Sequence, residues 1–167
     1  LDEINDNDIL IYLDAGCSIN IHGKTQFDEY IEMLNKSDKG IISFQMPHVE
    51  KKYTTKEIFN YFNIDINSEY ATSGQILDGI LIMKKNKNLN IIIDLWHNVI
   101  YDEPLLFTDH YNKMGQCKDF IDNRHEQSIL SLVRKKHGSI VLMDETYFQP
   151  FGNNESLKFP FWTTRKK

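Results

Sequence analysis

The sequence has few of the residues that mark several common classes of protein. Only 2 of its 167 residues are cysteine, 4 are proline and 8 are glycine. The low proline and glycine contents exclude a collagen-like chain and do not favour a disordered one. Cys17 and Cys117 lie far apart and are too few for a disulfide framework, so free thiols in a reducing compartment are the simpler interpretation.

An excess of positive charge and a long apolar run are also missing. The chain has 19 Lys and Arg against 24 Asp and Glu, a formal net charge of −5, which disfavours binding to a nucleic-acid backbone. It contains no run of 18 apolar residues, and its N-terminal sequence lacks the basic and apolar regions of a signal peptide. We therefore expect a cytoplasmic protein with no transmembrane segment in this chain and no nucleic-acid partner.

What is present is the composition of a folded domain. Hydrophobic residues make up 41%, charged residues 26% and aromatic residues 12% of the chain. A chain of this length can remove about 70% of its unfolded surface from water around one core. We expect one domain over residues 1–167, with residues 146–167 as an extended aromatic tail packed on it.

Short apolar runs alternate with amphipathic segments along the chain. The run 9–13 is typical of a strand buried on both faces, and further strands are predicted at 40–46, 79–83 and 140–143. Helical spacing of apolar residues predicts helices over 25–34, 58–62, 89–100 and 122–137. This alternation predicts a layered α/β fold with a mainly parallel sheet.

Asp14 is the first residue that could carry chemistry. It follows the first strand directly and precedes Ala15 and Gly16. Ligands of open α/β sheets bind at such strand ends, and a turn of small residues lets a carboxylate approach a phosphate or its metal ion. Asp14 is therefore a candidate metal ligand. The alternative is an Asp that starts a turn by hydrogen bonding to the backbone.

The polar segment 122–128 opens the clearest helix. A helix N-terminus favours anions, and Arg124 could add a charge-assisted bond to a phosphate or carboxylate. His125 and Glu126 could act as metal ligand, nucleophile or proton carrier. The alternative is a capping box with Asn123 as N-cap and Glu126 three positions later.

Two further places offer polar side chains beside apolar runs. Gly79 permits close approach of a ligand, and Gln75 and Asp78 could bond sugar hydroxyls, although a plain loop explains the same residues. Asp94 is an acid in an otherwise apolar helix, so it is a candidate general base or a paired structural acid. The basic segment 134–137 is interpreted as the solvated last turn of a helix.

The order of these segments is more informative than any one of them. The strand end at 13–16, the loop 73–80, the segment 94–96 and the helix start 123–132 together resemble the GT-A type nucleotide-diphospho-sugar glycosyltransferases. The resemblance is closest to a bacterial and viral group related to capsular-polysaccharide transferases, and the C-terminal sequence 160–165 also resembles this group. Because Asp14 comes so early, the resemblance implies a partial GT-A fold that lacks most of the nucleotide-binding part.

The resemblance implies metal-assisted transfer of a hexose from a nucleotide sugar to a glycan or protein hydroxyl. Asp14 would hold a divalent cation, Mn²⁺ or Mg²⁺, against the donor diphosphate, although Gly16 stands where the family usually has a second acid. The implied catalytic residues are Asp94 and Glu126. The implied substrate-binding residues are Gln75, Asp78, Gly79, Arg124, His125 and Gln127.

A non-catalytic module that binds carbohydrate or protein is the alternative function. Its contact surface would be the aromatic residues of the tail, which can stack on sugar rings or simply cover the core. These residues are Tyr147, Phe148, Phe151, Phe159, Phe161 and Trp162. A phosphoryl transferase that uses Asp14 is a third possibility, but it needs a second acid or a basic clamp near that strand end.

Overall fold

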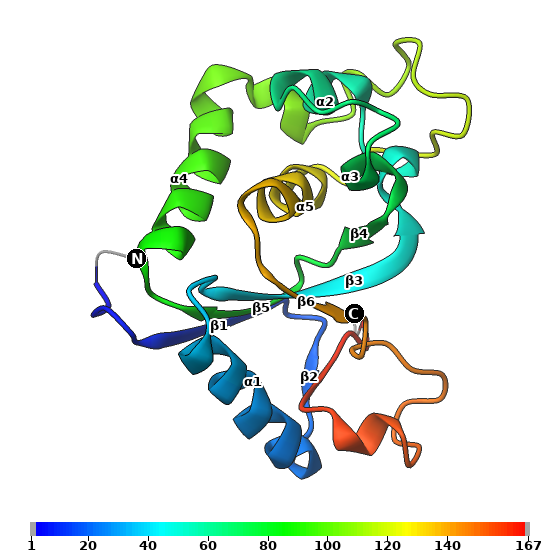
Figure 1. The fold of residues 1–167 in the computed structure, drawn as a ribbon. Coiled ribbons are helices and arrows are strands. Elements are labelled where there is room, and N and C mark those ends of the chain that lie inside the picture. The colour runs from blue at the N-terminus through cyan, green and yellow to red at the C-terminus, as the bar shows by residue number, and fades with distance from the viewer. Residues whose placement is uncertain (1–2, 166–167) are drawn as a thin grey trace. The chain divides into compact units, whose positions relative to one another are not determined.

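The computed structural model describes residues 3–165. The chain divides into two compact units, of which the first holds the described residues up to Phe44, Gly79–Asn90 and those from Ser139 on. The second unit holds Gln45–Asp78 and Ile91–Gly138. Figure 1 labels the elements of both units. The expectation of one domain over the whole chain stays a prediction.

Within the residues that the structure describes, the main sheet has five strands and is mainly antiparallel. β1 (Ile9–Leu13) pairs antiparallel with β5 (Ile80–Lys84), and β5 pairs antiparallel with β3 (Ile41–Val49). β3 then pairs antiparallel with β4 (Gly74–Ile76), and β6 (Ile140–Met143) also pairs with β3.

The predicted parallel sheet and the partial GT-A fold are therefore wrong. The positions of the strands at 9–13, 79–83 and 140–143 agree with the structure to within a residue. Their direction does not, because a run of Ile, Leu and Val that is buried on both faces reads the same in parallel and antiparallel sheets.

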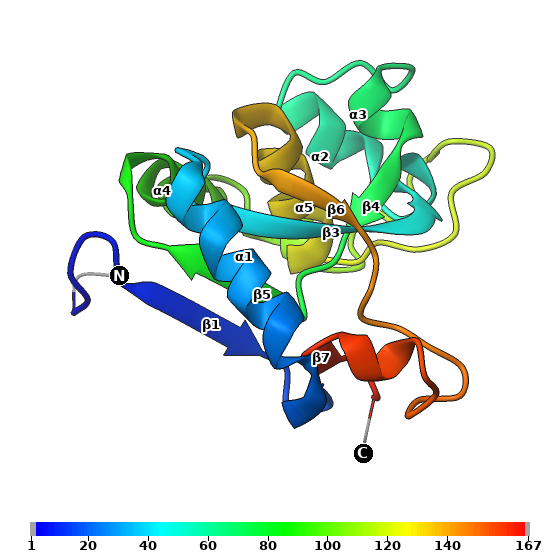
Figure 2. The ribbon, with the colours of Figure 1, turned by 60° about the horizontal axis from the view of Figure 1, so that its bottom comes forward.

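The first unit joins the N-terminal helix to the C-terminal tail. α1 (Lys24–Lys36) buries Tyr30 and Leu34, as its spacing predicts, and packs against β5, as Figure 2 shows. β2 (Ser18–Ile19) and β7 (Phe161–Trp162) form a second, two-stranded antiparallel sheet. The 3-10 helices η1 (Ile21–Gly23) and η4 (Ser156–Lys158) lie at the ends of these strands.

The aromatic rings of the tail pack mostly on one another and on α1. The ring centroids of Phe148 and Phe159 are 5.4 Å apart in a stacked pair, and those of Phe151 and Trp162 are 5.8 Å apart. Phe161 is 6% exposed and makes an edge contact with Phe27. This packing supports the covering role for the tail over a carbohydrate-stacking surface.

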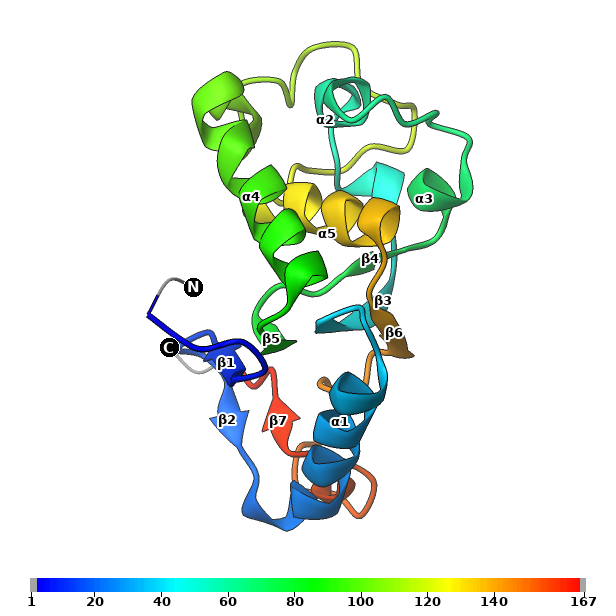
Figure 3. The same cartoon turned by 60° about the vertical axis from the view of Figure 1, so that its left-hand side comes forward.

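The second unit is built around α5 (Glu126–His137), which packs against β4. It also contains α2 (Lys56–Tyr61), α3 (Glu69–Thr72) and the 3-10 helices η2 (Glu50–Lys52) and η3 (Pro104–Phe107). α4 (Lys87–Asp102), labelled in Figure 3, begins in the first unit and continues into the second. None of the described helices is both long enough and apolar enough to cross a lipid bilayer.

The polar side chains before α2 and α5 do not cap these helices. The N-cap of α2 is Thr55, while the Thr54 hydroxyl donates to Glu50 instead of capping the helix. The N-cap of α5 is His125, because the side-chain amide of Asn123 donates to the carbonyls of Leu106 and Thr108. The capping-box alternative for 122–128 is therefore wrong, because carbonyls 17 and 15 positions upstream bind the Asn123 side chain.

Candidate functional site

The start of α5 presents an accessible histidine on a strained backbone. His125 has φ 50° and ψ −120°, a region that residues with a Cβ disfavour. Its Nε2 lies 2.7 Å from Oδ1 of Asp109, and the two side chains are 38% and 71% exposed. The strained backbone therefore holds a His–Asp pair where a solute can reach it.

The partner of His125 determines its tautomer. A carboxylate has no proton to donate, so the bond to Asp109 requires the hydrogen on Nε2 of the neutral imidazole. Nδ1 then carries the lone pair. A histidine with this orientation can take a proton at Nδ1, while the carboxylate stabilises the imidazolium that forms.

Arg124, the residue before His125, adds a cation to the helix start. Its guanidinium carbon lies 5.2 Å from the centroid of the Tyr53 ring, and its backbone N–H donates to the Tyr53 carbonyl. The side chain is exposed, as is that of Glu126 in the first turn of α5. The helix start thus combines a cation, the positive end of the helix dipole and a proton acceptor, which suits a substrate that carries both an anionic group and a hydroxyl.

Gln127 connects the helix start to the interior. Its side-chain amide donates to Oε1 of Gln75 across 2.6 Å, so the structure brings together two residues that the resemblance placed in one site. The Gln75 amide nitrogen in turn donates to Oε1 of Glu50 across 2.8 Å. Gln75 is 1% exposed, so in this structure it meets Gln127 and Glu50 and not a solute.

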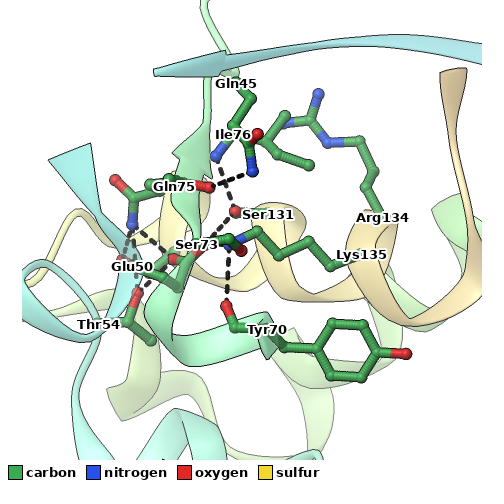
Figure 4. Close-up of polar contacts among 12 residues, drawn as sticks. Gln45, Glu50, Thr54, Tyr70, Ser73, Gln75, Ile76, Ser131, Arg134 and Lys135 are labelled. Atoms are coloured by element: carbon green, nitrogen blue, oxygen red, sulfur yellow. Dashed lines mark hydrogen bonds and ion pairs between the residues drawn. The ribbon is translucent and has the colours of Figure 1, made fainter. Parts of the chain in front are cut away.

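Glu50 is the centre of a buried polar network, shown in Figure 4. Its carboxylate is fully buried and also accepts hydrogen bonds from the hydroxyls of Thr54 and Ser131. Nζ of Lys135 lies 2.9 Å from its Oε2, with the Lys135 side chain only 6% exposed. Burial lowers the pKa of Lys135, and the attraction of Glu50 opposes this shift. The network therefore holds a charge pair in the core.

The interpretation of 134–137 as a solvated turn is wrong for its first two residues. Arg134 is 0% exposed, and its Nη2 donates to the Leu77 carbonyl across 2.8 Å. Burial lowers the pKa of Arg134 to about 10, while Asp78 and Glu50 raise it. Position 134 lies four residues after the buried Leu130, so helical spacing was the signal that could have placed it on the inner face.

Asp14 and Gly79 lie together in the first unit. The Asp14 carboxylate accepts from the Tyr12 hydroxyl across 2.9 Å, and a Cβ on Gly79 would lie 2.8 Å from Asp14 Oδ2. In this structure the Asp14 carboxylate occupies the space beside Gly79, and the approach of a ligand to Gly79 stays a prediction. Burial and the neighbouring Asp14 raise the pKa of the Cys17 thiol.

A cation site formed by protein ligands alone is not present in the described part of the chain. Among residues 3–165, no three His, Cys, Asp or Glu side chains lie close enough to hold a metal ion. Asp14 belongs to the first unit and Glu126, Asp78 and Asp94 to the second. Among the described residues, Asp14 therefore has no set of three protein ligands around it for the divalent cation that the resemblance implies.

Asp94 occupies an exposed position on α4. An exposed acid in an otherwise apolar helix needs no partner, so the structural pairing considered for Asp94 is not required. Its catalytic role stays a prediction. Asp109, which pairs with His125, was missed because it lies 16 residues upstream in a loop without periodicity.

Comparison with known proteins identifies no relative. No protein-family model matches the chain, and neither a curated protein nor a solved structure matches it.

Proposed function

We propose that the chain is a glycosyltransferase that moves a hexose from a nucleotide sugar to a hydroxyl of a glycan or protein. The observation that carries the proposal is the accessible His125–Asp109 pair beside Arg124 at the start of α5. The motif order along the sequence supplies the substrate class. The proposal rests on these residues and makes no use of a GT-A sheet.

The acceptor hydroxyl is activated by His125. Its proton passes to Nδ1 as the acceptor oxygen forms a bond to the anomeric carbon of the donor sugar, and Asp109 stabilises the resulting imidazolium. The bond from the anomeric carbon to the diphosphate oxygen breaks, and its electron pair leaves with that oxygen. A single displacement of this kind inverts the anomeric configuration.

The leaving diphosphate is stabilised by the groups around His125. Arg124 offers charge-assisted hydrogen bonds, and the positive end of the α5 dipole complements the charge that develops on the leaving oxygen. Glu126 lies in the same turn and could bond a donor-sugar hydroxyl. No step here is routed through a metal ion, because the described residues do not form a site for one.

The cytoplasm is the compartment that we propose for this reaction. Cys17 and Cys117 are both free thiols, which is usual for proteins in a reducing compartment. The resemblance to capsular-polysaccharide transferases favours a reaction on nucleotide sugars made in the same compartment.

The test is donor turnover by the product of the complete coding sequence. It would be supplied with UDP- and GDP-sugars, simple saccharide acceptors and either Mg²⁺ or Mn²⁺, and release of nucleoside diphosphate would be measured. We expect His125→Gln to lower kcat by about 10²–10⁴-fold, because the proton acceptor is lost.

His97→Gln is the matched control for this experiment. His97 is an exposed histidine on α4 whose ring contacts Tyr101, and its replacement should leave turnover unchanged. Turnover of no donor together with no nucleotide binding would refute the proposed reaction. Turnover that is unaffected by His125→Gln would refute the assigned base.

A further inference from the structure

β1 is an edge strand with apolar side chains in water. It lies at one end of the strand order β1-β5-β3-β4. Its residues Leu10, Ile11 and Tyr12 are 37%, 36% and 50% exposed. The sequence predicts burial on both faces for this run, and the structure covers neither face fully. Edge strands in folded proteins usually carry charged or short segments at such positions, because an open apolar edge pairs readily with another chain.

Hydrogen-bonding groups point away from the sheet at the outer edge of β1. The Asp14 amide donates to the Gly79 carbonyl and the Lys85 amide donates to the Asp8 carbonyl, so residues 8 and 14 direct their backbone groups toward β5. Backbone groups alternate in direction along an antiparallel strand. The N–H and C=O groups of Ile9, Ile11 and Leu13 therefore face outward, and we call these groups the free edge of β1.

An apolar groove lies beside the free edge. It has a volume of about 330 Å³ and is lined by Ile11 from β1 together with residues of β2, η1, α1 and β7. Two of these residues, Ile19 and Ile21, are 68% and 81% exposed. A strand paired to β1 would place one of its side chains next to Ile11, where the groove could receive it.

The charges at the ends of β1 indicate which strand fits. Asp6 and Asp8 precede β1, Asp14 follows it, and all three are exposed. A second copy paired antiparallel about Ile11 would bring Asp8 opposite Asp14 at both ends, which like charges oppose. An incoming strand with Lys or Arg at its ends would instead meet opposite charge at each end.

We propose that the free edge of β1 binds an extended segment of another polypeptide by β-strand addition. The segment has apolar side chains at alternate positions and basic residues at both ends. Its backbone pairs with Ile9, Ile11 and Leu13, and one apolar side chain enters the groove beside Ile11. This inference is independent of the proposed transfer reaction, since it uses residues of the first unit alone.

The test uses defined peptides and amide hydrogen exchange measured by NMR. The probe is the acetylated heptapeptide Lys-Val-Thr-Val-Thr-Val-Lys, and the comparison peptide has Glu in place of both lysines. We expect the lysine peptide to slow exchange of the Ile9, Ile11 and Leu13 amides by at least about tenfold, while the Leu10 and Tyr12 amides, already paired with β5, do not change. The glutamate peptide should bind at least about tenfold more weakly.

A matched pair of variants locates the binding site. Ile11→Lys should abolish binding of the lysine peptide, because it adds like charge and removes the apolar wall of the groove. Val141→Lys places the same charge on β6 at another exposed apolar position, 51% exposed, and should leave binding unchanged.

Three results would overturn the proposal. The first is unchanged exchange at Ile9, Ile11 and Leu13 with the lysine peptide at saturating concentration. The second is slow exchange at these amides in the peptide-free monomer, since the edge would then already be covered. The third is protection that rises with protein concentration alone and accompanies a dimer in sedimentation, since the occupant would then be a second copy.

Discussion

At the scale of single residues, the core carries charge that composition does not reveal. The Glu50 carboxylate accepts hydrogen bonds from Thr54, Gln75 and Ser131 in addition to its ion pair with Lys135. Such a pair contributes little over an apolar replacement of both partners, but loss of one partner leaves a buried charge without compensation. The pair is thus a strong constraint on which single substitutions the fold tolerates.

Lys135→Met should lower the free energy of unfolding by about 3–5 kcal/mol, because Glu50 would remain charged and buried. The double variant Glu50→Gln/Lys135→Met should recover most of that loss. Urea unfolding followed by circular dichroism measures both values. Lys113→Met, at an exposed position, is the control and should change stability by less than about 0.5 kcal/mol. A double variant as unstable as Lys135→Met would contradict this account.

At the scale of elements, the local sequence pattern predicts the buried face of α5 but not where the helix starts. The apolar spacing of Ile129, Leu132 and Val133 predicts the buried face of the helix correctly, since all three are fully buried. The helix start was not predictable in the same way. Asn123 has the right type and spacing for an N-cap, but its side chain donates to the carbonyls of Leu106 in η3 and of Thr108, which lie 17 and 15 positions upstream. The strained His125 takes the N-cap position instead.

This arrangement predicts that stability and activity change in opposite directions at position 125. His125→Gly should raise the free energy of unfolding by about 1 kcal/mol, because glycine adopts a positive φ without a Cβ penalty. The same change should abolish hexosyl transfer, since Nδ1 is lost. Parallel denaturation and turnover measurements check both effects.

Asn63→Gly is the control for position 125. Asn63 also has a positive φ, 52°, but asparagine tolerates this conformation better than histidine does, so its replacement should change stability much less. A His125→Gly variant that is less stable than the parent chain would show that the contact with Asp109 outweighs the backbone strain.

At the scale of the whole molecule, strand direction decides the architecture. The apolar runs at 9–13 and 79–83 were assigned correctly as strands, and a parallel arrangement was inferred from their alternation with helices. The structure pairs these two strands antiparallel, with Ile9 opposite Lys84 and Leu13 opposite Ile80. The 65 or more residues between them allow either direction, so connection length gave no constraint.

A cross-linking experiment distinguishes the two directions. In a chain with Cys17 and Cys117 replaced by Ser, the pair Ile9→Cys/Lys84→Cys should form a disulfide on mild oxidation, because opposite residues of an antiparallel ladder without mutual hydrogen bonds have Cα atoms about 4.5 Å apart. Non-reducing electrophoresis and mass spectrometry detect the link. The pair Ile9→Cys/Ile80→Cys, which a parallel register would bring together, should stay reduced. The opposite outcome would contradict the antiparallel pairing.

The sequence by itself determined the local elements and the candidate segment at the helix start. Periodicity is a property of neighbouring residues, so it located α1, β5, α5 and β6 without tertiary information. Only the tertiary structure decided the direction of β1, the burial of Arg134 and the pairing of His125 with Asp109. These features depend on contacts between segments that are distant in the chain. The spacing of residues within one segment does not indicate which distant segment it will contact.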